Sequence, residues 1–177
     1  DWSSDVCSSD LAAMVSGSRL PPGRAAISYI KTLGGTKQST VIGSKFVTTA
    51  EHAALANGML VHADETDDSH APSLTHPGCG VVPAALAMAE RERANGTQLI
   101  RAVALGYDVG SRLSLSLHAH DFREAGHSTH TFGPMFGAAA AAGSLAKLNY
   151  DQCRWLLSYT VQQASGVSCW MRDEEHI

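Results

Sequence analysis

The stretch Gly133–Leu148, GPMFGAAAAAGSLAKL, indicates the fold class of this protein more directly than any other part of the sequence. Gly137 is followed there by the five alanines Ala138–Ala142, so this part of the segment carries no side chain larger than a methyl group. Alanine is the strongest helix former, and small side chains let two helix axes approach closely. The stretch is therefore predicted to be a helix that packs tightly against a neighbouring helix.

Apolar residues recur at helical spacing in further segments on both sides of this one. Additional helices are predicted at about Gly23–Leu33, from Thr48 toward Val61, and at about Val81–Ala94, Gln98–Leu117 and Asp151–Ala164. The segment Thr40–Phe46 is a short β-leaning connector and not part of a convincing sheet. The predicted fold class is all-α, a multi-helix core domain.

The starts of four helices are marked by residues that suit a first turn. Thr48 with Glu51, Thr97 and Asp151 are predicted N-caps, because their side-chain oxygens can accept hydrogen bonds from unpaired N–H groups. Pro83 has no N–H and is tolerated only in a first turn, so its helix is predicted to begin near that residue.

Length and composition describe one domain or a large piece of one. The chain has 177 residues, is 44% hydrophobic and 17% charged, and can therefore bury a core. Its net charge is −4, and its 13 basic residues are scattered. Because no basic stripe is present to neutralise phosphates, nucleic acid is not a predicted partner.

Cysteine usage and hydropathy point to a protein of the reducing cytoplasm. The four cysteines are widely spaced and form no C-x-x-C pair, which excludes a disulfide framework or a zinc knuckle. No apolar run reaches the roughly 18 residues of a membrane span, so no membrane partner is predicted. The start lacks the basic and apolar regions of a signal peptide.

Residues 1–11, DWSSDVCSSDL, differ in character from the rest of the chain. The triplet Ser-Ser-Asp occurs twice, and neither a helical nor a strand period is visible. The string resembles translated sequencing-adapter read-through. Residues 1–11 are therefore predicted to be a non-native tail, and residues 12–177 a partial helical domain.

The most reactive part of the sequence is the stretch His62–Pro77, called the acidic loop below. Its sixteen residues include three histidines and four acids and contain no Lys or Arg. Such groups are costly to place in a fold unless each has a partner or a task. Because apolar helical segments flank the loop, it is predicted to be held by a rigid scaffold, as active-site loops are.

The acids of this loop could perform proton transfer. Asp64, Glu65, Asp67 and Asp68 are close enough to raise one another's pKa, and the neighbouring His70 and His76 add a second kind of proton carrier. The alternative is a solvated acidic loop that caps neighbouring helices.

Metal binding is the alternative for the histidines. The acidic loop offers His62, Asp64, His70 and His76, and His118-x-His120-Asp121 resembles the H-x-H-x-D run of some metallohydrolases. Phe122 follows, however, where those enzymes have His, and no H-E-x-x-H pair is present. No metal site is therefore predicted.

Two histidines and one cysteine outside the acidic loop also have possible roles. His127 and His130 precede the predicted helix at Gly133, where free N–H groups suit an anionic substrate, although these histidines could equally cap loop carbonyls. Cys79 lacks any nucleophile signature and is predicted to be a small packing residue.

Several motifs in order resemble the MmgE/PrpD family, which includes 2-methylcitrate dehydratase, cis-aconitate decarboxylase and an iminodisuccinate epimerase. The likeness runs from about Ala25 to Ile177, and the motifs are A-N-G-M-L-V-H-A-x-E-x-D-D-S-H, H-P-G, P-A-A-L-A-x-A-E, G-Y-D-V, G-H-x-T, G-A-A-A-A-A and Q-x-S-G. The resemblance implies an all-helical core domain, an α/β lid domain that is missing from this chain, a homodimer, and catalysis without a metal or other cofactor.

The resemblance also assigns the site residues. The family's active-site aspartate falls on Glu65, and its D-D-T-H on Asp67, Asp68, Ser69 and His70, with Ser in place of Thr. Its H-P histidine is His76, and the histidine before its glycine-rich helix is His127. The predicted catalytic residues are His76, Glu65, Asp68 and His127, and the predicted substrate-binding residues are Asp67, Ser69 and His70.

The resulting hypothesis is a fragment of a metal-independent lyase that acts next to a carboxylate of a small substrate. The most favoured reaction is dehydration of a hydroxy-di- or tricarboxylate such as 2-methylcitrate. His76 would carry a proton, with Glu65 or Asp68 orienting it, and His127 would bind a substrate carboxylate. The alternatives are decarboxylation or epimerisation, a metal-dependent hydrolase, and a non-catalytic helical dimerisation module. The fragment alone is expected to be inactive.

Overall fold

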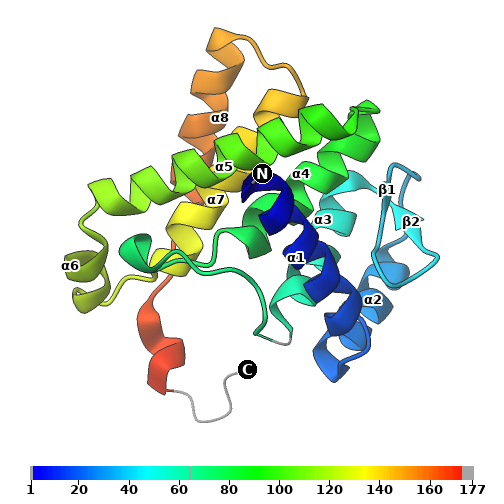
Figure 1. The fold of residues 1–177 in the computed structure, drawn as a ribbon, viewed down its shortest axis with the longest axis horizontal. Coiled ribbons are helices and arrows are strands. Elements are labelled where there is room, and N and C mark those ends of the chain that lie inside the picture. Colours follow the sequence, from blue (N-terminus) through cyan, green and yellow to red (C-terminus); the bar gives the residue numbers. More distant parts are fainter. Residues whose placement is uncertain (1, 64, 173–177) are drawn as a thin grey trace.

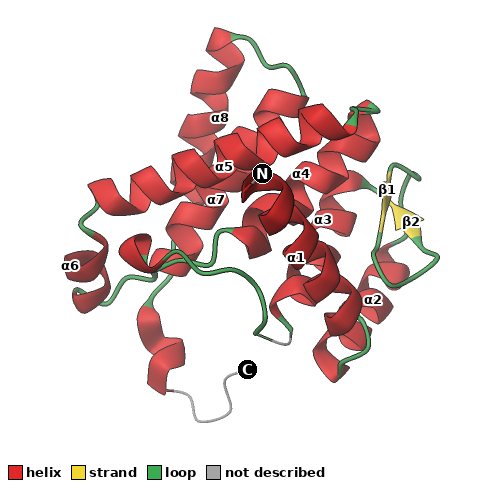
Figure 2. Ribbon diagram, viewed as in Figure 1, coloured by secondary structure: helices red, strands yellow, loops and turns green. Residues whose placement is uncertain are grey.

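The computed structural model describes residues 2–63 and 65–172, and almost all regular structure in these ranges is α-helical (Figure 2). The α-helices are α1 (Trp2–Gly17), α2 (Pro21–Leu33), α3 (Ala50–His62), α4 (Gly78–Glu92), α5 (Gly96–Ser116), α6 (Ala119–Glu124), α7 (Thr129–Leu145) and α8 (Tyr150–Gln163). Two 3-10 helices are η1 (Ala71–Ser73) and η2 (Ser168–Arg172). The predicted all-α class is confirmed.

A two-stranded hairpin lies at one edge of the molecule (Figure 2). Strand β1 (Ser39–Thr40) pairs antiparallel with β2 (Val47–Thr48), within and beside the predicted β-leaning connector. The buried Asn57 of α3 fixes this hairpin, because its Oδ1 accepts from the Ile42 N–H at 2.9 Å and its Nδ2 donates to the Thr40 carbonyl at 3.0 Å.

The hydrophobic core lies where α1, α3, α4, α5 and α7 meet. The largest fully buried apolar side chains come from α1, α2, the hairpin turn and these central helices: Met14, Ile30, Val41, Leu60, Val61, Val81, Val82 and Val103. Alanines of α3 and α4 fill the remaining space, so these two helices pack closely and hold the ends of the acidic loop.

The α5–α7 contact is the most extensive contact between two elements, and it depends on glycines (Figure 1). A Cβ added at Gly137 of α7 would lie 2.5 Å from the Gly106 carbonyl oxygen of α5. A Cβ added at Gly110 of α5 would lie 2.5 Å from the Gly133 carbonyl oxygen of α7. These distances leave no room for a side chain, so the predicted close packing of the Gly/Ala segment is confirmed.

Several helix starts differ from those predicted. The N-caps are Thr49, Asn95 and Asn149, and not Thr48, Thr97 and Asp151; Asn95 and Asn149 form complete capping boxes with Gln98 and Gln152. In each case two capping residues lie within one or two positions of each other, and at α5 and α8 the glutamine at the third helical position completes a capping box with the asparagine. Thr48 instead lies in β2, where its hydroxyl donates to the Gly34 carbonyl.

Three other segments also differ. Helix α4 begins at Gly78, so Pro83 lies beyond the first turn and gives no N–H to the Cys79 carbonyl. Helix α7 begins one turn earlier than predicted, at Thr129. The short helix α6 lies between two predicted helices, in a segment for which no helix was predicted.

Residues 2–17, which include most of the predicted tail, form the helix α1. Cys7, Asp10 and Met14 are buried, and the helix packs mainly against α3. The sequence of residues 1–11 shows no helical period, yet the described part of this segment is helical. Its buried side chains do not follow a regular apolar repeat, so the sequence pattern did not indicate the helix. The non-native origin of residues 1–11 stays a prediction.

Helix α8 extends away from the other helices at one end of the molecule (Figure 1). Its large side chains Tyr150, Trp155 and Tyr159 are exposed. No helix in the described part of the chain is long and apolar enough to cross a membrane.

We predict that replacing Gly137 with alanine destabilises the fold by about 1–3 kcal/mol, because the new Cβ forces α5 and α7 apart. The matched control is Gly96→Ala at the start of α5, where an added Cβ meets nothing within 4 Å. Urea unfolding followed by circular dichroism measures both variants. Equal stability of the two variants would show that α5 and α7 do not meet through Gly137.

Candidate active site

The acidic loop joins the end of α3 to the start of α4, as predicted. Its middle is closed by a bridge between His70 and Thr75, in which the His70 N–H donates to the Thr75 carbonyl at 2.9 Å. The Thr129 hydroxyl of α7 donates to the Leu74 carbonyl at the tip of this bridge. Three helices therefore position the loop. Of its residues, Asp64 lies outside the described residues.

The centre of the loop is a carboxylate between two imidazoles. The Asp67 side chain is 1% exposed; its Oδ2 lies 3.5 Å from His62 Nδ1, and its Oδ1 lies 3.9 Å from His76 Nδ1. Neither oxygen accepts a hydrogen bond from the part of the chain that the structure describes. The Asp67 carboxylate raises the pKa of His62, and this effect outweighs the opposing effect of burial.

His76 is held in a defined orientation. Its Nδ1 lies 2.7 Å from the backbone carbonyl of Asp68. Because a carbonyl can only accept, Nδ1 carries the hydrogen, and the lone pair of the neutral ring is on Nε2. The His76 ring lies 5.1 Å from that of His130 and 6.4 Å from that of His62, measured between centroids. These groups together can bind, hold and release protons.

Of the two histidines before the glycine-rich helix, His130 reaches this cluster. His130 lies in the first turn of α7, and burial is the main cause that lowers its pKa, followed by the neighbouring His76. His127 is exposed and stacks on Phe122 at 4.6 Å, and its backbone pairs with Val167. Sequence spacing gave no reason to expect different positions for His127 and His130. Their positions differ because α7 begins between them, at Thr129.

The other predicted residues of the loop face in different directions. The Asp68 Oδ1 accepts from the Gly78 N–H at 2.7 Å and caps α4, so it is the Asp68 backbone carbonyl that contacts His76. Ser69 and His70 line a separate hollow of about 470 Å³. The predicted substrate-binding set is therefore divided, with Asp67 in the histidine cluster.

Glu65 lies at the exposed edge of the loop. Its backbone has a positive φ of 56°, and its Oε1 lies 3.5 Å from His62 Nε2. Its carboxylate therefore contacts His62 and not His76 among the described ion pairs.

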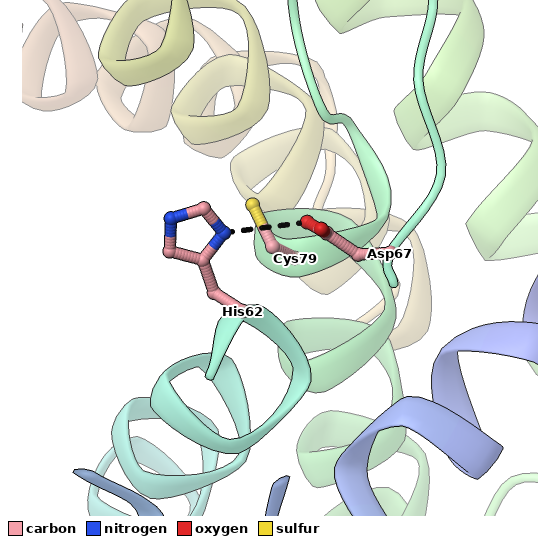
Figure 3. A group of neighbouring side chains, drawn as sticks. All are labelled: His62, Asp67 and Cys79. Carbon is pink, nitrogen blue, oxygen red and sulfur yellow. Dashed lines mark ion pairs between the residues drawn. The ribbon is translucent and has the colours of Figure 1, made fainter. Parts of the chain in front are cut away.

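Cys79 lies at the start of α4 beside the same cluster (Figure 3). His62 and Cys79 line a hollow of about 460 Å³, together with residues of α3 and α4. The Sγ atom donates to the His76 carbonyl at 3.0 Å, and burial strongly raises the pKa of the thiol. No motif surrounds Cys79 in the sequence, and it was therefore predicted to be a small packing residue.

Within the ranges that the structure describes, which leave out Asp64, neither metal-ligand set considered from the sequence is brought together. His118, His120 and Asp121 lie at and in the exposed helix α6. Within the described residues, the side chains that do come together are His62, Asp67 and Cys79, whose ligand atoms all lie within 4.8 Å of one another.

A second buried acidic pair lies behind the loop. Asp10 of α1 is fully buried, and its Oδ2 accepts a hydrogen bond from the Tyr107 hydroxyl at 3.1 Å. Burial and then the neighbouring Asp68 raise the pKa of Asp10 to about 7, against the lowering effect of the Tyr107 hydrogen bond. Burial is also the main cause that raises the pKa of Asp68. Both carboxyl groups therefore keep their protons to a higher pH than an exposed aspartate does.

A buried carboxylate between two imidazoles, on a loop between packed helices, makes this cluster a candidate acid–base site in an all-helical protein. Comparison with known proteins then identifies the family. The chain belongs to the MmgE/PrpD family, because the model of the MmgE/PrpD N-terminal domain matches residues 6–177.

Three curated relatives illustrate the similarity. Cis-aconitate decarboxylase of Mus musculus is 32% identical over 77% of this chain and 29% of its own length, and that of Homo sapiens is 31% identical over 78% and 30%. The cis-aconitate decarboxylase-like protein oryM of Aspergillus oryzae is 29% identical over 89% and 34%. The chain thus spans about a third of the length of the relatives it matches.

We predict that Asp10→Asn stabilises the chain more at alkaline than at acidic pH. The folded-state pKa is about 7. The ordinary value is about 3.9, so Asp10 costs no stability below that value, and the cost grows as pH rises until it levels off above the folded-state pKa. Between about pH 5 and about pH 8 the advantage of the variant should grow by roughly 2–3 kcal/mol.

Urea unfolding at the two pH values measures this difference. Asp151→Asn, at an exposed acid of α8, is the control and should show no such trend. An Asp10→Asn advantage that does not change with pH would contradict the burial of Asp10 against Tyr107.

Proposed function

We propose that this chain is the helical part of a longer lyase that acts on the carbon next to a carboxylate of a small di- or tricarboxylate. Family membership and the names of the relatives support this proposal. The observation that carries it is the position of His76, whose Nδ1 is fixed by the Asp68 carbonyl so that Nε2 can exchange a proton.

The favoured reaction is dehydration of a hydroxy acid such as 2-methylcitrate. A base takes the proton next to the carboxylate, the C–O bond breaks, and an acid protonates the departing hydroxyl to give water. His76 fills one of these roles and the protonated His62, held by Asp67, is placed to fill the other. The Glu65 carboxylate, 3.5 Å from His62 Nε2, stabilises the protonated form of His62. His127 would bind a carboxylate of the substrate.

Decarboxylation is the second candidate, and the relatives' names favour it. There the bond to a carboxylate carbon breaks, carbon dioxide leaves, and the remaining carbanion takes its proton from an acid such as His76. Epimerisation would use the same proton transfers without loss of a group. In each case we propose that the positively charged side chains that balance the substrate carboxylates come from the rest of the longer protein. We also propose that the longer protein acts as a cytoplasmic homodimer.

Replacing His76 with Gln in the full-length protein should reduce turnover by at least about 100-fold, because general acid–base catalysis contributes roughly that factor or more. The protein is incubated with chelator and 2-methylcitrate, citrate, cis-aconitate or iminodisuccinate in deuterated water. Proton NMR then reports loss of water, loss of carbon dioxide or deuterium exchange, and so names the reaction.

The matched control is His120→Gln, which removes an exposed imidazole of α6 and should leave turnover unchanged. Equal activity of the His76 variant and the unmodified protein would refute the assigned role. Activity that appears only after metal is restored would support the metal-dependent hydrolase instead. Substrate turnover by the full-length protein also argues against the non-catalytic dimerisation module.

A further inference from the structure

We propose that His62, Asp67 and Cys79 form a binding site for a divalent transition-metal ion such as Zn²⁺ (Figure 3). The three side chains come from the end of α3, from the acidic loop and from the start of α4. Their ligand atoms lie within 4.8 Å of one another, and Asp67 points toward the His62 ring with Cys79 beside the line between them.

The donor atoms select the class of metal. An imidazole nitrogen, a thiolate sulfur and a carboxylate oxygen are together the ligands of zinc and related borderline-soft ions, whereas Mg²⁺ and Ca²⁺ prefer oxygen ligands. With the thiol deprotonated, two negative charges balance the charge of the ion. Three protein ligands leave a fourth position for water, as in catalytic zinc sites.

The burial of the Asp67 carboxylate and of the His62 Nδ1 atom is the second, independent observation. The Asp67 side chain is 1% exposed, and neither of its oxygens accepts a hydrogen bond within the described residues. The Nδ1 atom of His62, which faces Asp67, is buried and also makes no hydrogen bond there. Buried polar atoms without hydrogen bonds are costly, and a cation bound by His62 Nδ1 and one Asp67 oxygen would compensate this cost.

The surroundings allow the site to close. Zinc bonds of about 2.0–2.3 Å place tetrahedral ligand atoms roughly 3.3–3.8 Å apart, so ligand atoms that now lie within 4.8 Å of one another need to approach by at most about 1.5 Å. The His62 side chain is 41% exposed at the end of α3 and can turn inward. The hollow of about 460 Å³ that His62 and Cys79 line gives solvent access to the fourth position.

An ion bound at this site would inhibit the lyase reaction, a consequence that rests on the proposed function. A metal bound to Asp67 and His62 withdraws the carboxylate from His76 and removes the His62 proton. Metal binding itself is measured without substrate, so it can succeed or fail independently of the proposed reaction.

The test uses the full chain, freed of metal by a chelator that is then removed. Calorimetry with Zn²⁺ should give one ion per chain. Titration with Co²⁺ should give a sulfur-to-cobalt charge-transfer band, which reports a bound thiolate directly. Cys79→Ser should abolish this band, and Asp67→Asn and His62→Gln should each weaken Zn²⁺ binding about tenfold or more.

Two control variants make the result specific. Cys153→Ser replaces an exposed thiol of α8, and His120→Gln an exposed imidazole of α6; both should bind Zn²⁺ like the unmodified chain. Circular dichroism checks that each variant is folded, and Asp67→Asn replaces Cys79→Ser as the deciding variant if the latter does not fold. A charge-transfer band that is absent, or that survives Cys79→Ser, overturns the site, as does unchanged Zn²⁺ affinity in folded Asp67→Asn.

Discussion

Contact between the backbones of α5 and α7 through glycines sets the positions of the other elements around the candidate site. The second turn of α7, whose Gly133 meets Gly110, also meets α4, because a Cβ added at Gly80 would lie 2.9 Å from the Pro134 Cβ. The two contacts place the start of α4 and the start of α7 side by side. His76 lies two residues before α4, and His130 lies in the first turn of α7. Their ring centroids are thereby brought to within 5.1 Å of each other. Close helix packing is therefore what assembles the site.

The fold class and the general location of the site were predictable, because both depend on local sequence. A run of alanines favours a helix whatever surrounds it, and a loop rich in acids and histidines is polar in any fold. The helix caps were less predictable. Asn95 and Thr97 are both good capping residues, and only the complete capping box with Gln98 distinguishes them.

The arrangement within the site was not predictable, because it depends on which direction each side chain takes. Asp67 and Asp68 are neighbours in sequence, yet the first lies between His62 and His76 while the second caps α4. His127 and His130 are likewise separated by the helix start between them. Cys79 carries no local motif and joins His62 and Asp67 only through the packing of α3 against α4. Tertiary contacts decide all three cases.

The acids of the loop resolve an apparent conflict between its charge and its proposed substrate. A loop without Lys or Arg offers no permanently charged cation to a carboxylate. The buried Asp67, however, raises the pKa of His62 and so favours the imidazolium form, which is itself a cation. Because Asp67 is 1% exposed, its own negative charge lies behind the histidine and away from solvent. Asp67 thus favours a positively charged His62 at the edge of the hollow. The two Asp67 oxygens, which accept no hydrogen bond within the described residues, also support the metal site that we propose there when substrate is absent.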